Sequence, residues 1–372
     1  MQKSAMHKFL AFLLIAQLCL PFSLQAADLP LDRLNLPPGF AIEVWVDDIE
    51  NARQMARGDQ GTLFVGSRGA GKVYMVPKID SAGEKRVLTL MSGMRSPSGI
   101  AFHDGDLYVA DVSDLWRFRD IENHLLDPPE PELVLDTLPT DRMHGWKNID
   151  FGPDGGLYIP VGAPCNVCDP GLPYASIHRL NLDSMNMQLV ATGIRNTVGF
   201  DWHPQTGQLW FTENGRDMMG DDLPPCEINV VTQPNQHFGY PYLHASNVPD
   251  PEFATRKPAD VEVTPPALEL GAHVAPLGLH FYQGDMFPEQ WQGSVFVAEH
   301  GSWNRSEKIG YRLMVGEVQG EKIVNYRPFV DGWLQPGDLT WGRPVAFEPL
   351  PDGSLLVSDD YAGVIYRISY DN

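Results

Sequence analysis

One histidine and a group of arginines stand next to short apolar segments of the chain. His144 precedes an apolar segment that begins at Ile149, and Arg195 and Asn196 precede another one. A histidine can exchange a proton near neutral pH, because its ordinary pKa is about 6.5. Guanidinium groups hold carboxylates and phosphates through paired hydrogen bonds. Residues of these two types at one site would bind an anionic ligand and transfer a proton.

Further candidates of the same kind lie beside later apolar segments. They are His300, Trp303, Arg305, Arg343 and Asp360. Each has an alternative interpretation, because a histidine near a strand is more often a hydrogen-bonded structural residue. The arginines can equally form salt bridges between neighbouring elements. Only their placement around one common axis would make them a binding site.

A loop rich in oxygen ligands follows residue 212. Glu213-Asn214-Gly215-Arg216-Asp217 leads to Asp221 and Asp222, and Glu227 comes shortly after. Carboxylates and backbone carbonyls at glycine turns are the ligands that calcium prefers. The spacing does not match an EF-hand, so calcium is inferred from the density of oxygen atoms. A solvated acidic loop is the alternative.

A repeated pattern identifies the elements that must position these residues. An apolar strand, a turn with Gly and often Asp or Pro, and a second apolar strand recur six times. The second strands begin at Leu63, Leu107, Leu157, Leu209, Val295 and Leu355. Their spacing is close to the roughly 40–50 residues of one four-stranded propeller blade plus insertions. Alternation with a period of two predicts strands throughout.

The sequence therefore predicts an all-β fold, a six-bladed β-propeller of four-stranded antiparallel blades over residues 27–372. Closing such a ring requires a strand from the other end of the chain. Residues 41–46 alternate well and can supply it. The longest interval between repeats contains an insertion at about 213–275, and loops of this kind often carry function.

The first 26 residues have the features of a cleavable signal peptide. Lys3 and Lys8 precede an apolar run at 9–20, and Ala26 is a small residue before the expected cleavage point. The run is roughly a dozen residues, short of the roughly 20 that a membrane-spanning helix needs. An uncleaved anchor is the alternative. We expect an exported protein, periplasmic or secreted, without a transmembrane segment in the mature chain.

Composition narrows the partners and cofactors. Asp and Glu number 48 against 27 Lys and Arg, so nucleic acid is not an expected partner. Cys165 and Cys168 can bridge in an oxidising compartment, although the loop between them is short. Asp169 follows them where a haem attachment motif has His, so the chain is not expected to carry haem.

Several motifs in combination resemble those of the soluble PQQ-dependent sugar dehydrogenases, with the sorbosone dehydrogenase branch most similar. The resemblance covers nearly all of the mature chain. The motifs that carry it are His144-Gly145 before a Gly-Pro-Asp-Gly turn, Arg195-Asn196 with Trp202-His203-Pro204, the loop 212–217, Phe238-Gly239-Tyr240-Pro241 and His273-Val274-Ala275-Pro276.

The resemblance implies a propeller that holds pyrroloquinoline quinone (PQQ) over the channel mouth and oxidises an aldose or related sugar. His144 would be the general base, and Arg195 with Asn196 would stabilise charge on the quinone oxygen. The other cofactor-binding residues would be His273, His300, Trp303, Arg305, Arg343 and Asp360. Calcium would bind the carbonyls of Gly215 and Arg216, with Asp222 and Glu227 nearby. A separate acceptor, a quinone or a cytochrome, would take the electrons.

Two residues depart from the family pattern. Met143 stands where the glucose enzyme has an acid before the base, and Cys226 stands where the sorbosone branch commonly has a carboxylate. Two other functions fit a propeller as well. A calcium-dependent, lactonase-like hydrolase would place carboxylates around a metal on the axis, and a non-catalytic binding module would need no cofactor.

Overall fold

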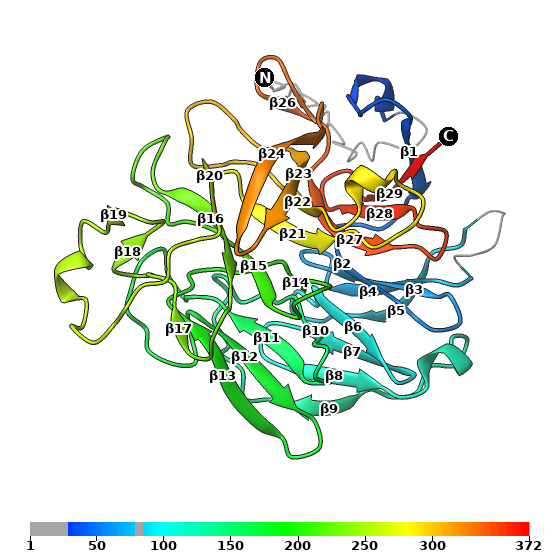
Figure 1. The fold of residues 1–372 in the computed structure, drawn as a ribbon. Coiled ribbons are helices and arrows are strands. Elements are labelled where there is room, and N and C mark those ends of the chain that lie inside the picture. The colour runs from blue at the N-terminus through cyan, green and yellow to red at the C-terminus, as the bar shows by residue number, and fades with distance from the viewer. Residues whose placement is uncertain (1–28, 79–84, 372) are drawn as a thin grey trace, which may run out of the picture.

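A computed structural model describes residues 29–78 and 85–371 of the chain. The described residues form an all-β, six-bladed propeller, as the repeats predict (Figure 1). Within these ranges no helix has the length and apolar character needed to cross a membrane. The predicted signal peptide, residues 1–26, lies outside the described residues.

The first three blades are four-stranded antiparallel sheets that follow one another along the chain, and a short parallel strand extends the third. Blade one comprises β2 (Ala52–Arg57), β3 (Leu63–Ser67), β4 (Lys72–Val76) and β5 (Leu88–Ser92). Blade two comprises β6 (Gly99–His103), β7 (Asp106–Ala110), β8 (Leu115–Phe118) and β9 (Glu132–Leu135). Blade three comprises β10 (Asp150–Phe151), β11 (Leu157–Val161), β12 (Ser176–Asn181), β13 (Asn186–Thr192) and the added strand β17 (Gln236–His237).

The last three blades repeat the plan. Blade four comprises β14 (Phe200–Trp202), β15 (Leu209–Glu213), β16 (Pro225–Val230) and β20 (Leu268–Ala272). Blade five comprises β21 (Pro276–Phe281), β22 (Val295–Glu299), β23 (Arg312–Gln319) and β24 (Lys322–Val330). Blade six comprises β27 (Pro344–Pro349), β28 (Leu355–Asp359), β29 (Val364–Tyr370) and β1 (Phe40–Val46).

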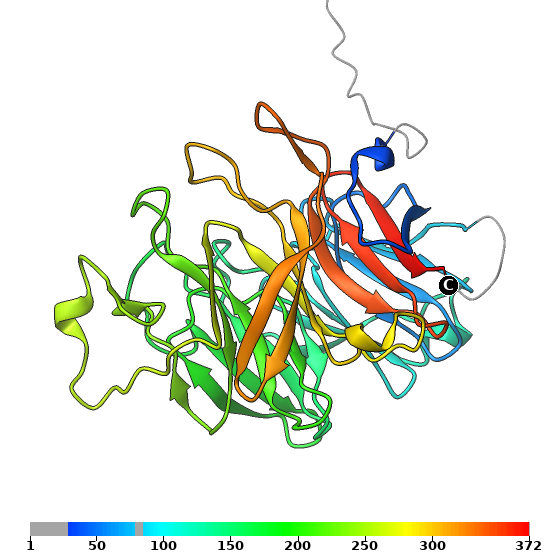
Figure 2. The same cartoon turned by 45° about the horizontal axis from the view of Figure 1, so that its top comes forward.

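The short elements lie in connections between blade strands, except for η2, which precedes β1. They are the hairpins β18 (Leu243–His244) with β19 (Val248–Pro249) and β25 (Leu334–Gln335) with β26 (Leu339–Thr340), and the 3₁₀ turns η2 (Leu31–Arg33), η3 (Ile121–Asn123), η4 (Ala254–Arg256) and η5 (Glu289–Trp291). The hairpin of β18 and β19, together with η4, projects at one edge of the molecule in both views (Figures 1 and 2).

The second strand of every blade is the segment identified by the repeat. β3, β15, β22 and β28 are buried along their whole length, because their side chains meet neighbouring blades on both faces. The first strand of each blade lies nearest the axis, and β2 contacts both β6 and β27. The inner strands therefore surround a central channel.

The ring closes through the predicted N-terminal strand. β1 pairs antiparallel with β29, from Phe40 opposite Tyr370 to Val46 opposite Ile365. It forms the outer strand of blade six and covers an edge that would otherwise expose unpaired backbone groups. The prediction of closure by residues 41–46 is confirmed.

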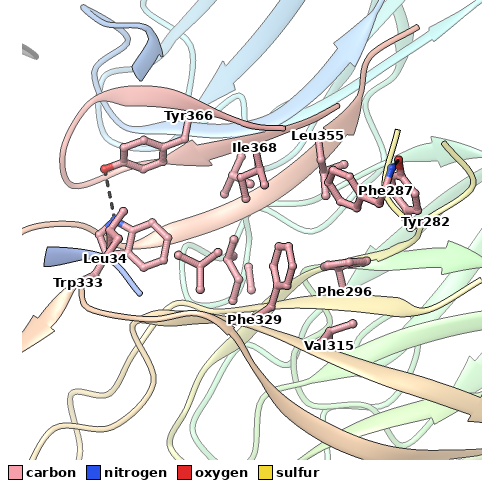
Figure 3. Packing of buried hydrophobic residues seen from close by; sticks show 14 of the residues in the cluster. Leu34, Tyr282, Phe287, Phe296, Val315, Phe329, Trp333, Leu355, Tyr366 and Ile368 are labelled. Carbon is pink, nitrogen blue, oxygen red and sulfur yellow. Dashed lines mark hydrogen bonds between the residues drawn. The ribbon is translucent and has the colours of Figure 1, made fainter. Parts of the chain in front are cut away.

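A layer of aromatic residues joins blades five and six (Figure 3). Phe296 and Phe329 pack edge-to-face with ring centroids 4.8 Å apart, and Phe287 stacks on Tyr282 at 4.2 Å. The Trp333 indole N–H donates a 3.3 Å hydrogen bond to the Tyr366 hydroxyl. Each such buried side chain contributes roughly 1.5–3 kcal/mol to folding through the apolar surface that it removes from water. This packing holds blade six, which carries part of the site described below.

The segment 213–275 combines blade strands with an excursion. β16 and β20 within it are the third and fourth strands of blade four. The chain between them carries β17, β18, β19 and η4. The excursion is anchored where Arg216 pairs with Asp250 at 2.5 Å, a contact that is buried.

Candidate functional site

A cavity of about 320 Å³ opens at one end of the channel. We call this the histidine end. Its wall is formed mainly by turns that precede inner strands and turns that follow second strands. The predicted site residues that line it are His144, Arg195, Asn196, Gly215, His273, His300, Trp303 and Arg343. The fold thus brings together candidates that the sequence places in four different blades.

His144 is held in one orientation by the backbone. Its Nδ1 lies 2.7 Å from the carbonyl oxygen of Ala163, which can only accept, so Nδ1 carries the proton. Nε2 is left with a free lone pair. His144 has a φ of 51°, and its Cβ lies so close to Gly162 that a Cβ added to that glycine would come within 2.5 Å of it. The glycine allows the turn and the strand end to meet.

The His144 imidazole is neutral at physiological pH. Burial lowers its pKa from 6.5 to about 3, and the positive charge of Arg195 acts in the same direction. A neutral imidazole with an open Nε2 can accept a proton from a ligand. The nearest candidate for an orienting acid, Asp141, accepts a 2.5 Å hydrogen bond from the Tyr174 hydroxyl instead. The carbonyl of Ala163 therefore takes the orienting role that Met143 cannot fill.

All five N–H groups of the Arg195 side chain are used within the protein. Nε donates to the Asn166 carbonyl at 2.8 Å, and Nη2 donates to Asn166 Oδ1 at 3.0 Å and to Asp217 Oδ2 at 2.9 Å. Nη1 donates to the carbonyls of Asn214 and Gly215 at 3.2 and 2.9 Å. Arg195 is thus a fixed positive charge in the cavity wall rather than a free donor.

A buried carboxyl supports the same turn from behind. Glu213 accepts hydrogen bonds from the backbone N–H groups of Arg195 at 2.6 Å and Asn196 at 3.4 Å. Burial, followed by the nearby charge of Glu227, raises the pKa of Glu213 well above its usual value. Glu213 therefore fixes the backbone of the turn that carries both predicted residues.

Three further arginines form what we call the guanidinium cluster: Arg53, Arg68 and Arg343, all lining the cavity. Arg68 lies 3.8 Å over the ring of Trp146, and its guanidinium donates no hydrogen bond to any residue in 29–78 or 85–371. The Arg343 guanidinium makes only long hydrogen bonds, at 3.4 Å to the His300 carbonyl and 3.5 Å to the Gly301 carbonyl, and it lies 5.3 Å over the Tyr311 ring. Both guanidinium groups thus have donors to spare.

The third member, Arg53, is buried and pairs with Asp360 at 2.8 Å. Its Nε has no partner among the described residues. Asp360 also accepts from His300 Nε2 at 2.8 Å. Burial alone would raise the pKa of Asp360, but His300 and Arg53 hold it below its usual value. Asp360, a predicted cofactor ligand, lies behind the cavity wall and orients Arg53 and His300.

The remaining predicted cofactor residues, His273, Trp303 and Arg305, differ in their relation to the cavity. His273 Nε2 donates to the Gly220 carbonyl at 2.8 Å. Trp303 is 69% exposed, with its ring open to solvent at the cavity mouth. Arg305 does not line the cavity, because it pairs with Asp222 at 3.0 Å and with the Asp221 carbonyl.

The four predicted calcium residues are not brought together. The Gly215 carbonyl faces the Arg195 guanidinium, and the Arg216 side chain pairs with Asp250. Asp222 is 86% exposed beside Arg305. Glu227 is buried and accepts from the Ala245 N–H at 2.6 Å. Within the described chain no group of three or more His, Cys, Asp or Glu side chains is placed to hold a metal, so the side chains of Asp222 and Glu227 do not join the Gly215 and Arg216 carbonyls in one donor set.

Sequence reasoning missed Arg53, Arg68 and Trp146, and it placed Asp217 in the oxygen-rich loop without pairing it with Arg195. A signal for Arg68 exists, because it directly follows the second strand of blade one, as His300 and Asp360 follow those of blades five and six. Applying that rule to every repeat would have found it. Arg53 lies in the first residues of an inner strand, and nothing in its local sequence distinguishes it from a strand residue with an ordinary surface role.

The opposite end of the channel differs in the charge of the residues that line it. A second cavity of about 300 Å³ is lined there by Asp150, Asp201 and Glu348, with Arg57 and His280. We call this the carboxylate end. His280 Nδ1 lies 3.1 Å from Asp201 Oδ2. Arginines therefore dominate one mouth of the channel and carboxylates the other.

Cys165 and Cys168, which the sequence left open, form a disulfide directly beside the histidine end. Cys226 is a free, buried cysteine in the cavity wall. Burial raises the pKa of its thiol to about 11, so it remains protonated at neutral pH.

Comparison with known proteins gives related chains and related folds. An uncharacterized protein of Borreliella burgdorferi is 33% identical over 359 residues, which cover 93% of this chain and 93% of that protein. The holo pyranose dehydrogenase PQQ domain from Coprinopsis cinerea superposes with a TM-score of 0.74 at 18% identity, covering 90% of this chain and 97% of that one.

Two further solved structures share the fold. The calcium structure of a Trichoderma reesei enzyme of carbohydrate-active family AA12 has a TM-score of 0.72 at 18% identity, covering 91% of this chain and 97% of that one. The PQQ-bound aldose sugar dehydrogenase from Streptomyces coelicolor has a TM-score of 0.63 at 19% identity, covering 91% and 100%. The family model described as TrAA12-like matches residues 175–371, more than half of the chain. The chain therefore belongs to the TrAA12-like family.

Proposed function

We propose that this protein is a PQQ-dependent dehydrogenase that oxidises a hydroxyl or hydrated aldehyde of an aldose or sorbosone-like sugar. One observation carries the proposal. A neutral histidine with an open Nε2 lies in the same cavity as a guanidinium cluster whose donors are only partly used. The names of the structural neighbours, a pyranose dehydrogenase PQQ domain and an aldose sugar dehydrogenase, agree with it.

The guanidinium cluster fits a planar quinone that carries several carboxylates. Arg68 and Arg343 have unused donors, and the buried Arg53 Nε lacks a partner among the described residues. A guanidinium binds a carboxylate through two parallel hydrogen bonds. Among the described residues, Asp217 and Asp360 are the only carboxylates that pair with the guanidinium groups of the four arginines in the cavity wall, so a net positive charge faces the ligand. Trp303 and Trp146 supply ring faces beside it.

Arg53, Arg68 and Arg343 would hold PQQ, which would supply the acceptor for the hydride of the sugar carbon that carries the reacting hydroxyl. His144 Nε2 takes the proton of that hydroxyl, so that a carbonyl forms on the sugar. The Ala163 carbonyl holds the Nδ1–H and stabilises the imidazolium that results. Arg195 acts through its charge, which favours negative charge developing near it, because its donors are already occupied. No step is assigned to calcium, since the predicted ligands do not form a donor set.

The wider setting follows from the sequence. We propose that residues 1–26 direct export to the periplasm or the outside of the cell, and that 27–372 form the catalytic propeller. The electrons then pass to a separate acceptor, a quinone or a cytochrome. The exposed edge of the cavity beside Trp303 gives such an acceptor access.

The alternatives are less well supported. A lactonase-like hydrolase needs carboxylates that converge on a metal, and the described residues hold no such group. The carboxylate end of the channel has one histidine, His280, and one arginine, Arg57, but three carboxylates line it as well, so it lacks the excess of guanidinium groups found at the histidine end. A non-catalytic module gives no reason for a histidine whose open nitrogen faces the cavity.

The test begins with the purified apo-protein. PQQ binding is measured by titration, and dye reduction is then followed with a panel of aldoses, with and without added calcium. We expect saturable PQQ binding and sugar-dependent dye reduction. His144→Ala should abolish reduction while PQQ still binds. His124→Ala, which removes an exposed histidine directly after η3, is the matched control. Absence of PQQ binding to the wild-type protein would refute the proposal.

A further inference from the structure

One short segment touches both residues to which we assign the chemistry. Residues 163–168 follow β11 and form the turn Ala-Pro-Cys-Asn-Val-Cys. At its start, the Ala163 carbonyl accepts from His144 Nδ1, and the Ala163 N–H donates to the Arg195 carbonyl at 2.8 Å. The segment therefore fixes the histidine ring and the backbone of the arginine at the same residue.

Asn166 then holds the arginine side chain and its partner carboxylate. Its carbonyl and Oδ1 accept from Arg195 Nε and Nη2 at 2.8 and 3.0 Å. The same Oδ1 accepts from the Asp217 N–H at 2.8 Å, and its Nδ2 donates to the Asp217 carbonyl at 3.0 Å. Four hydrogen bonds from one residue thus set where the positive charge and Asp217 lie relative to each other.

Asn166 is itself held on both sides. It lies between Cys165 and Cys168, which are joined by the disulfide. The buried hydroxyl of Tyr240 accepts from the Cys168 N–H at 3.0 Å and contacts Cys165 Sγ at 3.4 Å and the Asn166 carbonyl at 3.5 Å. A covalent cross-link reduces the number of conformations open to a short loop. A turn without such a cross-link would leave the Asn166 side chain free to rotate away from Arg195.

We propose that the disulfide-closed loop 163–168 is a positioning device for the catalytic pair, and that Asn166 is a positioning residue for Arg195. The loop orders Arg195 and Asp217 before any ligand binds. Its effect on turnover rests on the proposed function, whereas its effect on the order of residues 214–218 does not. The two can therefore be tested separately.

The first test uses hydrogen exchange of the apo-protein, which needs no activity. Dithiothreitol is oxidised to its cyclic disulfide as Cys165 and Cys168 each take up one electron and one proton, and mass spectrometry verifies the reduction. We expect peptides covering 163–169 and 214–218 to exchange about tenfold faster, because local opening becomes easier. Peptides from β28 should not change. The Cys165→Ser, Cys168→Ser double variant should reproduce the result without reductant.

Two outcomes would overturn the proposal at this stage. One is unchanged exchange at 214–218 after verified reduction. The other is an equal rise in every peptide, β28 included, since the disulfide would then be a general stabiliser rather than a local one. Neither outcome depends on whether the protein oxidises sugars.

The second test uses the PQQ-loaded protein and separates Asn166 from its neighbours. Asn166→Ala should lower kcat by about tenfold to a hundredfold, with KM for the sugar changed much less, because misplacement of a charge acts on the transition state. Asn166→Asp keeps an acceptor for Arg195 and the Asp217 N–H and should restore most of kcat. Asn181→Ala, at the end of β12, removes the two hydrogen bonds that Asn181 Oδ1 accepts from Ser184 and is the matched control.

The kinetic outcomes are also decisive. A kcat of Asn166→Ala equal to that of the Asn181→Ala control would overturn the positioning role. Equal losses of kcat in Asn166→Ala and Asn166→Asp, accompanied by the same fall in melting temperature, would also overturn it, because they would indicate a loss of stability. If the wild-type protein shows no dehydrogenase activity at all, the proposed function fails, and the exchange experiment alone decides on the loop.

Discussion

The two mouths of the channel differ in charge although the same six blades build both. The histidine end gathers a neutral histidine and three arginines from turns that flank the strands, and a fourth arginine, Arg53, from the start of β2. The carboxylate end is lined by residues of the inner strands themselves, among them Asp150, Asp201 and Glu348. The cavities are similar in volume, about 320 and 300 Å³. Size therefore does not distinguish them, and an anionic ligand is directed to one mouth by charge.

The comparison also shows which positions a propeller leaves free for chemistry. Residues in the turns at the histidine end lie outside the strand pairing. Long side chains, or glycines that allow close approach, can therefore occur there without disturbing the backbone hydrogen bonds of a blade. Side chains at the carboxylate end are fixed by the register of the inner strands. Functional change is thus easier at the first end than at the second.

The largest expected effect is a difference in kcat between two variants, each of which lacks the histidine side chain at one end of the channel. His144→Ala should lower kcat by about 10²- to 10⁴-fold, the usual contribution of a general base. His280→Ala, at the carboxylate end, should leave kcat within about threefold, because distant sites act independently. Dye-coupled kinetics of the two PQQ-loaded variants measures both. Equal losses would mean that the two ends do not divide the chemistry as described.

The next effect concerns cofactor affinity. Arg68→Ala should weaken PQQ binding by about tenfold to a hundredfold, because one charge-assisted guanidinium contact contributes about 1.5–3 kcal/mol. Arg57→Ala, at the carboxylate end, should change the Kd by less than about twofold. Calorimetric titration of apo-protein compares the pair. A greater loss in Arg57→Ala would place the anion at the wrong mouth for our proposal.

The two ends should also respond to pH in opposite directions. Burial, followed by the charge of Asp150, raises the pKa of Glu348 from 4.5 to about 8, so its folded form binds a proton that the unfolded form releases. The contribution of Glu348 to the free energy of unfolding is fully present below pH 4.5 and is lost as the pH rises to 8. His144, with its pKa lowered to about 3, loses its contribution as pH falls from 6.5 toward 3.

Glu348→Gln tests this difference directly. It should raise the melting temperature by about 1–3 °C at pH 8.5 relative to wild type, with no gain at pH 4.5. Calorimetry across this range makes the measurement, and Glu289→Gln, on the surface turn η5, is the control. A gain of the same size at both pH values would show that Glu348 does not change its protonation on unfolding.

The smallest effect concerns metal ions. Neither end presents a preformed donor set among the described residues. Addition of 1 mM calcium, or of a chelator, should therefore shift the melting temperature of the apo-protein by less than about 1 °C, because stabilisation requires binding to the folded state. A shift of several degrees would reveal a calcium site that the predicted residues do not form.

The sequence predicted the fold in most of its detail. The apolar residues after each turn, such as Leu63 and Leu355, mark buried second strands, and a period of two cannot be produced by helices. The closing strand at 41–46 was found because it lacks any nearby partner. These features depend on local pattern, which one sequence displays.

The site was predicted less completely. His144, Arg195 and Arg343 were found because they lie next to strand boundaries. The positions of the other candidates depend on partners far along the chain, which no local pattern reveals. Asp222 pairs with Arg305, Arg216 pairs with Asp250, and Glu227 accepts from the Ala245 N–H. Residue type indicated oxygen ligands, whereas only the packed structure shows these pairings, together with the hydrogen bond that the Gly215 carbonyl accepts from Arg195.

The closure of blade six by β1 has a consequence for biosynthesis. β1 emerges early from the ribosome, and its partner β29 emerges more than 300 positions later. Such distant pairing makes folding slow, because a long loop must close before the pairing is gained. Arg343 and Asp360 belong to this last blade, so the guanidinium cluster is completed only when the ring closes. A nascent or truncated chain should therefore fail to take up an anionic ligand, and ligand retention would report that the ring has closed.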